Sequence, residues 1–408
     1  MSYVGLNMSA IAEALKIYYL PGLRYQLNDK ASALLAQIDK NSENVSGKEI
    51  RMALRYGRVG GIGNRPDDGT LPVPAARQTV QAVWDTKNIF ARFRLTDKTI
   101  AASKDNVGAF ANMLETEISD CETDARLDLS RQVIGSGNGV LATVSSQEAY
   151  SSNVLTVNVD TTMYLAEGML VEIKQANGTQ RNAHVDGPKK IISVLSPTQF
   201  TMEAGGDPST VSTDVVAISG NTYDDTGLKS YELTGVQAVV ATGGTLYGID
   251  RTDNLWLNGV VDAVNGQISE VGIQKNIDAV EVGSGSETNF LFTSKGVSRA
   301  YQNLQTAMKQ HVNTLDLKGG WSALSYTGGQ KELPLVSDKY VPEGLLFGLD
   351  LNDWIMAQMG DWDWLDKDGA MLSRVQDRAA WEATLVKYCD MACQRPRGQF
   401  VMTGITEL

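Results

Sequence analysis

The sequence has few of the residues on which enzymes and secreted proteins commonly depend. It contains 3 cysteines and 2 histidines among 408 residues. So sparse and odd a set of cysteines argues against a disulfide framework and fits a reducing compartment. No apolar run approaches membrane-spanning length, and the N-terminus lacks the basic segment, apolar run and small-residue cleavage site of a signal peptide. We therefore expect a soluble protein that is intracellular where it is made.

The scarce histidines and cysteines form no catalytic or metal-binding pattern. His184 and His311 stand in no triad or metal motif. Cys389 and Cys393 are four residues apart in RAAWEATLVKYCDMACQR, a pattern that predicts a helix near the C-terminus. Two thiols without further ligands make a poor zinc site. We expect no enzyme activity, no catalytic residue, no cofactor and no metal ligand.

The densest acidic stretch is DWDWLDKDG, residues 361–369. It differs from a calcium-binding EF-hand loop, because Leu365 and Asp366 occupy positions that require Asx and Gly. A weak cation site and a solvated acidic turn both remain open. Nearby tryptophans suit either a sugar cleft or a core or subunit interface: Trp354, Trp362, Trp364 and Trp381. A carbohydrate-active or calcium-dependent binding protein is therefore an alternative function.

Charge is distributed unevenly along the chain. The net charge is -12, which argues against a dedicated nucleic-acid binder. Residues 1–98 nevertheless hold 14 basic and 9 acidic side chains, a balance of +5, so residues 99–408 carry -17. Such asymmetry suggests that one part of the molecule is built to lie on another.

Two alternating segments flank a long loop. EIRMALRY (residues 49–56) and NIFARFRL (residues 88–95) have the period of half-buried strands. Between them, RYGRVGGIGNRPDDGTLPVP contains five glycines and three prolines, and it lacks both the P-loop and the dinucleotide-binding context. We predict that the two strands pair as a ribbon around this loop. Because a two-stranded ribbon is marginally stable alone, something must cover it.

A long amphipathic helix is predicted next. From Ser103, a candidate N-cap, to Ile134, apolar residues recur at steps of three and four, and Gly135 and Gly137 follow. At about 1.5 Å per residue the helix would be roughly 45 Å long. Its outer face is acidic and consists of Glu115, Glu117, Asp120, Glu122, Asp124 and Asp128.

The amino-acid composition then changes at two points along the chain. Residues 140–220 contain short runs rich in Val and Thr, with a hairpin-like Asn177-Gly178, and they predict a small inserted β domain. From Tyr231 onward, helical and strand-like stretches mix as in an α+β domain. The chain ends with an apolar strand pattern, GQFVMTGI.

This order of parts resembles the major capsid proteins of tailed bacteriophages, which have the Hong Kong 97-type fold. Four segments resemble segments that recur in that family: TGGTLYGIDRTDNLW, LKGGWSALSYTGG, PLVSDKYVPEGLLFGLDLNDW and QRPRGQFVMTGI. The resemblance covers most of the chain except residues 140–220. It implies an α+β fold with five parts: an N-terminal arm (1–47), an E-loop β ribbon (48–98), the spine helix of a peripheral domain (99–138), an inserted β-rich domain (139–225), and an axial domain with the remaining peripheral-domain strands (226–408).

The resemblance also implies a function without catalysis. A protein of this family is a structural head protein that assembles into hexamers and pentamers of an icosahedral shell around the double-stranded DNA genome. It would be found in the virion and assembled in the host bacterial cytoplasm. Its partners would be copies of itself, portal, scaffolding or decoration proteins, and DNA bound without sequence specificity, with no membrane. An encapsulin-like nanocompartment shell of the same fold stays open as an alternative.

In this family the E-loop lies over the peripheral domain of a neighbouring subunit, near its spine helix. We hypothesise that basic ribbon residues contact acidic residues of a neighbour, although alternating arginines are also typical of a solvated face. Some members cross-link their shells through a loop lysine, which we do not expect here because no lysine lies between Lys48 and Lys87. The residues expected at the contact are Arg51, Arg55, Arg58, Arg65, Arg77, Arg92, Arg94, Glu115, Glu117, Glu122 and Asp124.

Overall fold

The computed structural model divides the chain into two compact units. It describes residues 32–43, 45–58, 60–98, 107–181, 188–205, 210–224, 228–307, 314–317, 321–328, 331–366, 372–376 and 378–408. The first unit comprises Met1–Ser130 and Val239–Leu408, and the second comprises Arg131–Ala238. Ser103, His184, His311 and most of the expected N-terminal arm lie outside the described residues.

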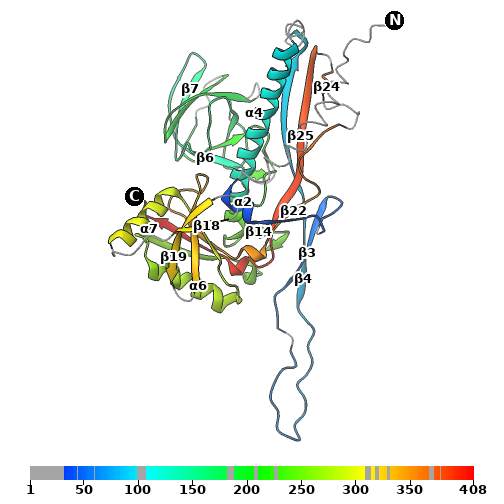
Figure 1. The fold of residues 1–408 in the computed structure, drawn as a ribbon, viewed down its shortest axis with the longest axis vertical. Helices are drawn as coiled ribbons and strands as arrows, with labels where there is room; N and C mark the ends of the chain where they lie inside the picture. The colour runs from blue at the N-terminus through cyan, green and yellow to red at the C-terminus, as the bar shows by residue number, and fades with distance from the viewer. Residues whose placement is uncertain are drawn as a thin grey trace. The chain divides into compact units, whose positions relative to one another are not determined.

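The first unit contains a ribbon formed by β3 (Glu49–Arg55) and β4 (Thr79–Asp85), with β2 (Val45–Ser46) beside β3 (Figure 1). The two long strands pair antiparallel from Glu49↔Asp85 to Arg55↔Thr79. Ile50, Met52 and Leu54 are buried along one face of β3, as its alternation predicted. The prediction that residues 49–56 pair with residues 88–95 is wrong, because β3 pairs with β4.

Residues 88–95 belong instead to β5 (Lys87–Thr96), which pairs along its whole length with β25 (Ala380–Cys393). These strands form a six-stranded sheet with β1 (Asp39–Asn41), β22 (Trp354–Gln358), β23 (Asp363–Trp364) and β24 (Ser373–Arg374). Only Thr86 separates β4 from β5, so the chain passes from one sheet into the other without a turn.

The helix expected near the C-terminus is a strand. Most of β25 is buried, including Leu385, Cys389 and Met391. A run that is apolar on both faces fits a helix and a strand equally well by periodicity. Here β25 has hydrogen-bonded strands on either side, β5 and β22, and this pairing decides the conformation.

A short helix, α2, belongs to the first unit, and the long helix that the sequence predicted, α4, begins in the first unit and ends in the second. In α2 (Ala33–Gln37), the Ser32 hydroxyl caps the first turn by accepting from the Leu35 N–H at 3.2 Å. The long helix α4 (Val107–Ile134) has 28 residues, about 42 Å at 1.5 Å per residue. Ile118, Ala125 and Leu129 are buried on one side of it.

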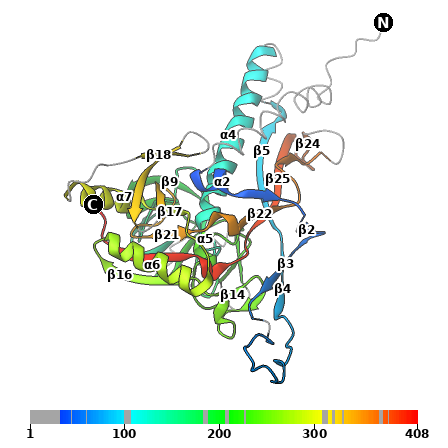
Figure 2. The same cartoon turned by 60° about the horizontal axis from the view of Figure 1, so that its bottom comes forward.

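The rest of the first unit is a mixed α and β region around a seven-stranded sheet. Its helix α6 (Glu270–Ser284) lies against β16 and β26, and α7 (Lys295–Ala307) lies against β20 (Figure 2). The core holds Ile273, Leu291, Tyr301 and Phe400. In order, the strands are β16 (Val260–Gly266), β26 (Phe400–Ile405), β21 (Leu346–Leu349), β17 (Phe290–Thr293), β20 (Lys331–Ser337), β19 (Trp321–Gly328) and β18 (Thr314–Leu317).

Short elements complete this region. Among the described residues, a two-stranded hairpin precedes α6, and three 3-10 turns lie between neighbouring strands. They are β14 (Thr245–Leu246), β15 (Ile249–Asp250), η2 (Leu255–Leu257), η3 (Leu351–Asp353) and η4 (Pro396–Gly398). The short helix α5 (Val236–Val239) includes the point where the second unit ends.

The second unit is a closed six-stranded β-barrel with an apolar core. Phe200, Val157 and Ile173 are among its fully buried residues. Arg181 binds Asp214 through two hydrogen bonds of 2.7 Å, an arrangement that gives an ion pair fixed geometry. In order, the strands are β10 (Gln199–Glu203), β7 (Val154–Val159), β6 (Val140–Ser151), β11 (Val215–Ile218), β8 (Leu170–Lys174) and β9 (Lys189–Ser196), and β12 (Thr222–Asp224) pairs with β13 (Leu228–Ser230).

Candidate functional site

The long loop, described over residues 57–58 and 60–78, continues past the ends of β3 and β4 as two extended segments side by side (Figure 1). A Cβ on Gly61 would lie 3.2 Å from the Pro74 Cα, and one on Gly63 would lie 3.7 Å from the Pro72 ring. Gly61 also has a φ of 96°, which favours glycine. Since proline has no backbone N–H to donate, Pro72 and Pro74 interrupt a regular ladder. Glycine on one segment and proline on the other therefore keep the loop narrow and extended.

Arg65 organises the tip of this loop. Its Nε donates to the Thr70 carbonyl at 3.0 Å, and its Nη1 donates to the Asn64 carbonyl at 3.1 Å. A turn between them is closed by the Gly69 N–H, which donates to the Pro66 carbonyl at 2.9 Å. Arg65 thus has a role within its own chain. Its expected contact with a neighbour stays a prediction.

The loop exposes large apolar side chains that the sequence analysis did not single out. Ile62, Leu71 and Val73 are 89%, 85% and 83% exposed. Single exposed apolar residues are common, but three large ones on one narrow loop leave apolar surface that the described part of the subunit does not cover. The signal was present in the sequence as apolar residues inside a Gly/Pro loop that has no core.

In contrast to its loop, the ribbon is anchored firmly at its base. Trp84 stacks on Tyr247 with ring centroids 4.1 Å apart, and its Nε1 donates to the buried Asp390 Oδ2 at 3.0 Å. The Tyr247 hydroxyl donates to the Met391 carbonyl at 3.2 Å and accepts from the Cys393 N–H at 2.9 Å. Burial raises the pKa of Tyr247 and keeps the phenol neutral, so it can both donate and accept.

Apart from Arg65, which binds carbonyl groups of its own loop, the arginines expected at the contact divide into two groups. Arg51 pairs with Glu49 at 2.9 Å, and both Arg92 and Arg94 pair with Glu382 at 3.3 Å. These three have acidic partners in their own chain, and Arg92 and Arg94 lie on β5, outside the ribbon. Within the described part of the chain, the remaining three side chains form no ion pair: Arg55, Arg58 and Arg77.

The acidic face of α4 is concentrated around Cys121. Burial first, and then the charges of Asp124, Glu117 and Glu122, raise the pKa of this thiol to about 11. Burial also raises the pKa of Glu122, and burial together with the charge of Asp120 raises that of Asp124. The side chain of Glu115 is outside the described residues. Among the described side chains, no ion pair joins this face to the ribbon.

The features considered for sugar or calcium binding are engaged in the fold. Trp354, Trp362 and Trp364 are at most 3% exposed and pack in the interior. The Lys387 Nζ lies 3.0 Å from the Asp361 Oδ1. In the described ranges, no group of three or more His, Cys, Asp or Glu side chains is placed to hold a metal ion.

Two further observations concern the reactivity of the cysteines near the C-terminus and the hydrophobicity of the helices. Cys389 and Cys393 are fully buried, and burial raises the pKa of both thiols, which makes them inert at neutral pH. As far as the helices are described, none is long and apolar enough to span a membrane.

Comparison with known proteins identifies the fold. No protein-family model and no curated protein matches the sequence. The structure is similar to the subunit in the capsid asymmetric unit of cyanophage A-1(L), with 13% identity, coverage of 92% of this chain and 93% of that one, and a TM-score of 0.54. This chain has a phage-capsid fold. The capsid of an empty GTA particle (11% identity, 92% and 90% coverage, TM-score 0.47) and Mycobacterium phage Bobi (11%, 98% and 99%, TM-score 0.45) were also matched. The capsid fold expected from the resemblance is confirmed.

Proposed function

We propose that this protein is the major capsid protein of a tailed bacteriophage, a shell subunit without catalytic activity. The observation that carries the proposal is the likeness to a cyanophage capsid subunit over 92% of the chain. The projecting loop supports it independently, because its exposed apolar residues need a partner. Copies of one chain that each offer a loop and receive one make head-to-tail contacts, which close into rings.

The parts of the chain receive the following roles in this proposal. Residues 1–47 are the N-terminal arm, and the E-loop is the ribbon β3–β4 with its loop. The helix α4 is the spine of the peripheral domain. The β-barrel is an insertion, expected over residues 139–225. The sheet that contains β16–β21 and β26 forms the axial domain.

The loop would bind its neighbour mainly through apolar contact. Full burial of one large aliphatic side chain contributes about 1.5–3 kcal/mol, whereas an exposed ion pair contributes roughly 0–1 kcal/mol. Ile62, Leu71 and Val73 would therefore supply most of the affinity. Arg58 and Arg77 would chiefly orient the encounter with an acidic face such as that of α4 and increase its rate.

The partners follow from this role. Copies of the chain would form hexamers and pentamers of an icosahedral shell, with portal, scaffolding or decoration proteins added. The shell would enclose double-stranded DNA without sequence-specific contacts, in keeping with the net charge of -12. Assembly would take place in the host bacterial cytoplasm, and the mature protein would be in the virion.

Sedimentation velocity of the purified protein, with negative-stain microscopy of any fast fraction, tests the proposal. Hollow shells or rings of five and six subunits are expected. A protein that remains a monomer or small dimer across salt and protein concentrations would refute it. Shells that package one particular protein in place of DNA would favour the nanocompartment alternative.

The contribution of the loop is tested by paired variants. Ile62→Ser with Leu71→Ser should abolish rapid assembly and leave the fold of the subunit intact, as judged by circular dichroism. Arg58→Glu with Arg77→Glu should slow assembly by about tenfold or more at low salt, within the range of electrostatic steering. Arg58→Lys with Arg77→Lys retains the charge and should assemble close to the wild-type rate. If all three variants assemble at one rate, the loop is not the contact.

A further inference from the structure

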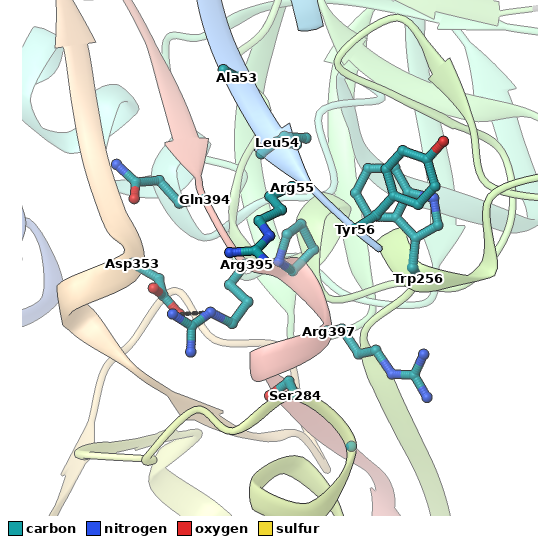
Figure 3. Close-up of a pocket in the computed structure, with 12 residues that line it drawn as sticks. Ala53, Leu54, Arg55, Tyr56, Trp256, Ser284, Asp353, Gln394, Arg395 and Arg397 are labelled. Carbon is teal, nitrogen blue, oxygen red and sulfur yellow. Dashed lines mark ion pairs between the residues drawn. The ribbon is translucent and has the colours of Figure 1, made fainter. Parts of the chain in front are cut away.

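A second basic feature lies where β3 ends and the loop begins, at the opposite end of the ribbon from Trp84. A pocket of about 380 Å³ opens between the end of β3, the C-terminal end of α6 and the turn η4 (Figure 3). Its lining includes Arg55 from β3, and Arg395 and Arg397 on either side of Pro396. Tyr56 stacks on Trp256, with ring centroids 5.0 Å apart, and forms another wall.

Positive charge dominates this pocket. Asp353 is the single carboxylate among the lining residues, against three guanidinium groups. It is 7% exposed, accepts a hydrogen bond from the Ser286 hydroxyl at 2.9 Å, and lies 3.8 Å from the Arg395 Nε. Figure 3 marks that ion pair with a dashed line. One acid therefore balances one arginine, and two positive charges are left over.

The two positive charges that Asp353 does not balance are those of Arg55 and Arg397. Both are exposed, and in the part of the chain that the structure describes neither side chain forms an ion pair or hydrogen bond. A planar guanidinium group binds a carboxylate through two parallel hydrogen bonds. The pocket therefore has the charge, the donors and the volume to receive an acidic side chain with part of its backbone.

We infer that this pocket receives an Asp or Glu side chain from a second copy of the chain, which gives the shell an inter-subunit contact separate from the one made by the exposed apolar residues of the loop. This inference rests on the proposed function. Charge complementarity favours a second copy, since each chain carries 12 more negative than positive charges. A nucleic acid fits less well, because Tyr56 and Trp256 already stack on each other and the basic residues line a pocket instead of an extended groove.

Zero-length cross-linking between isotopically distinct subunits tests the contact. Subunits with Arg55→Lys and Arg397→Lys are assembled from mixed ¹⁴N and ¹⁵N protein and treated with a carbodiimide, which joins an amine to a touching carboxylate. Peptide mapping should find links of mixed isotope from position 55 or 397 to an Asp or Glu. Arg51→Lys is the matched control, because Glu49 lies beside Arg51 in the same chain and its links should hold one isotope only.

The reverse-charge variant completes the test. Arg55→Glu with Arg397→Glu should slow assembly by about tenfold or more, within the range of electrostatic steering, while the subunit stays folded. Wild-type assembly with single-isotope links only, or an unchanged rate for this variant, overturns the inference and leaves the proposed function intact. A wild-type rate that depends on added phosphate or oligonucleotide, lost in this variant, would assign the pocket to phosphate groups and also overturn it. Failure of the wild-type protein to assemble at all would refute the proposed function itself.

Discussion

The strands β3 and β5 carry almost the same sequence pattern and have different partners. In each, apolar residues alternate with arginines, and the apolar face is buried. Across from β5 lies the long strand β25, where Glu382 meets both Arg92 and Arg94. Across from β3 lies β4, and Arg55 at its end has no acidic partner among the described residues. The arginines of β5 are therefore paired within the chain, whereas β3 has an arginine whose positive charge is available to a partner.

The largest expected effect is a difference in stability between a substitution in the core around β5 and one in the loop of the ribbon. Phe93 is 8% exposed and meets the Trp364 ring edge-on at 6.0 Å, so Phe93→Ala should reduce the free energy of unfolding by about 3–5 kcal/mol. Ile62→Ala, at a residue 89% exposed, should change it by less than about 0.5 kcal/mol. Urea unfolding of the unassembled subunit measures both. Similar losses would mean that the loop packs on its own subunit.

A smaller effect should come from the anchor at the base of the ribbon. Tyr247→Phe leaves the Met391 carbonyl and the Cys393 N–H without their partner, so we expect a loss of about 1–3 kcal/mol. Tyr56→Phe is the matched control, because Tyr56 stacks on Trp256 through its ring and that contact is kept. It should be close to neutral in the same unfolding experiment. Equal losses would show that the hydroxyl of Tyr247 does not secure the ribbon.

The sequence predicted local structure better than it predicted partners. The alternation around Arg51 and Arg92 gave two strands and their buried faces, and the spacing of Ile118, Ala125 and Leu129 gave a long helix. Neither strand pattern encodes which strand lies alongside, since pairing depends on residues outside the strand itself: Arg51 lies opposite Val83, and Arg92 lies opposite Thr384.

The elements that the sequence analysis predicted wrongly or missed also depend on residues outside their own segment. Cys389 and its neighbours were predicted as helix because a run that is apolar on both faces fits a helix as well as a strand, and only the strands on both sides of β25 determine its conformation. The strand β4 was missed because the sequence analysis assigned residues 75–87 to no element. The pocket at Arg55 and Arg397 brings together residues more than three hundred positions apart, so no local motif could reveal it.

The ion pairs of β5 should contribute modestly. Glu382→Gln removes the acidic partner of two arginines that are 53% and 36% exposed, so the loss should be at most about 1 kcal/mol and smaller at high salt. Assembly should proceed at the wild-type rate, since Arg92 and Arg94 serve the fold of their own chain. Faster assembly by this variant would instead support the prediction that these arginines contact a neighbour.

The smallest expected effect concerns the acidic face of α4. Burial and the charge of Asp120 raise the pKa of Asp124, so the folded subunit binds this proton more readily than the unfolded chain does. Its contribution to stability is therefore full below the ordinary value of about 4 and is lost as pH rises through the raised value. Asp124→Asn should stabilise the unassembled subunit at pH 7 by about 0.5 kcal/mol or less, on the scale of exposed charges, and have no effect near pH 3. Unfolding midpoints at the two pH values measure this difference. If the same variant assembles more slowly at pH 7, the carboxylate costs the isolated subunit stability and benefits the shell, as expected of a face that receives arginines from a neighbour. A variant that is less stable at pH 7 would place a cation of its own subunit beside Asp124 and remove it from the proposed contact.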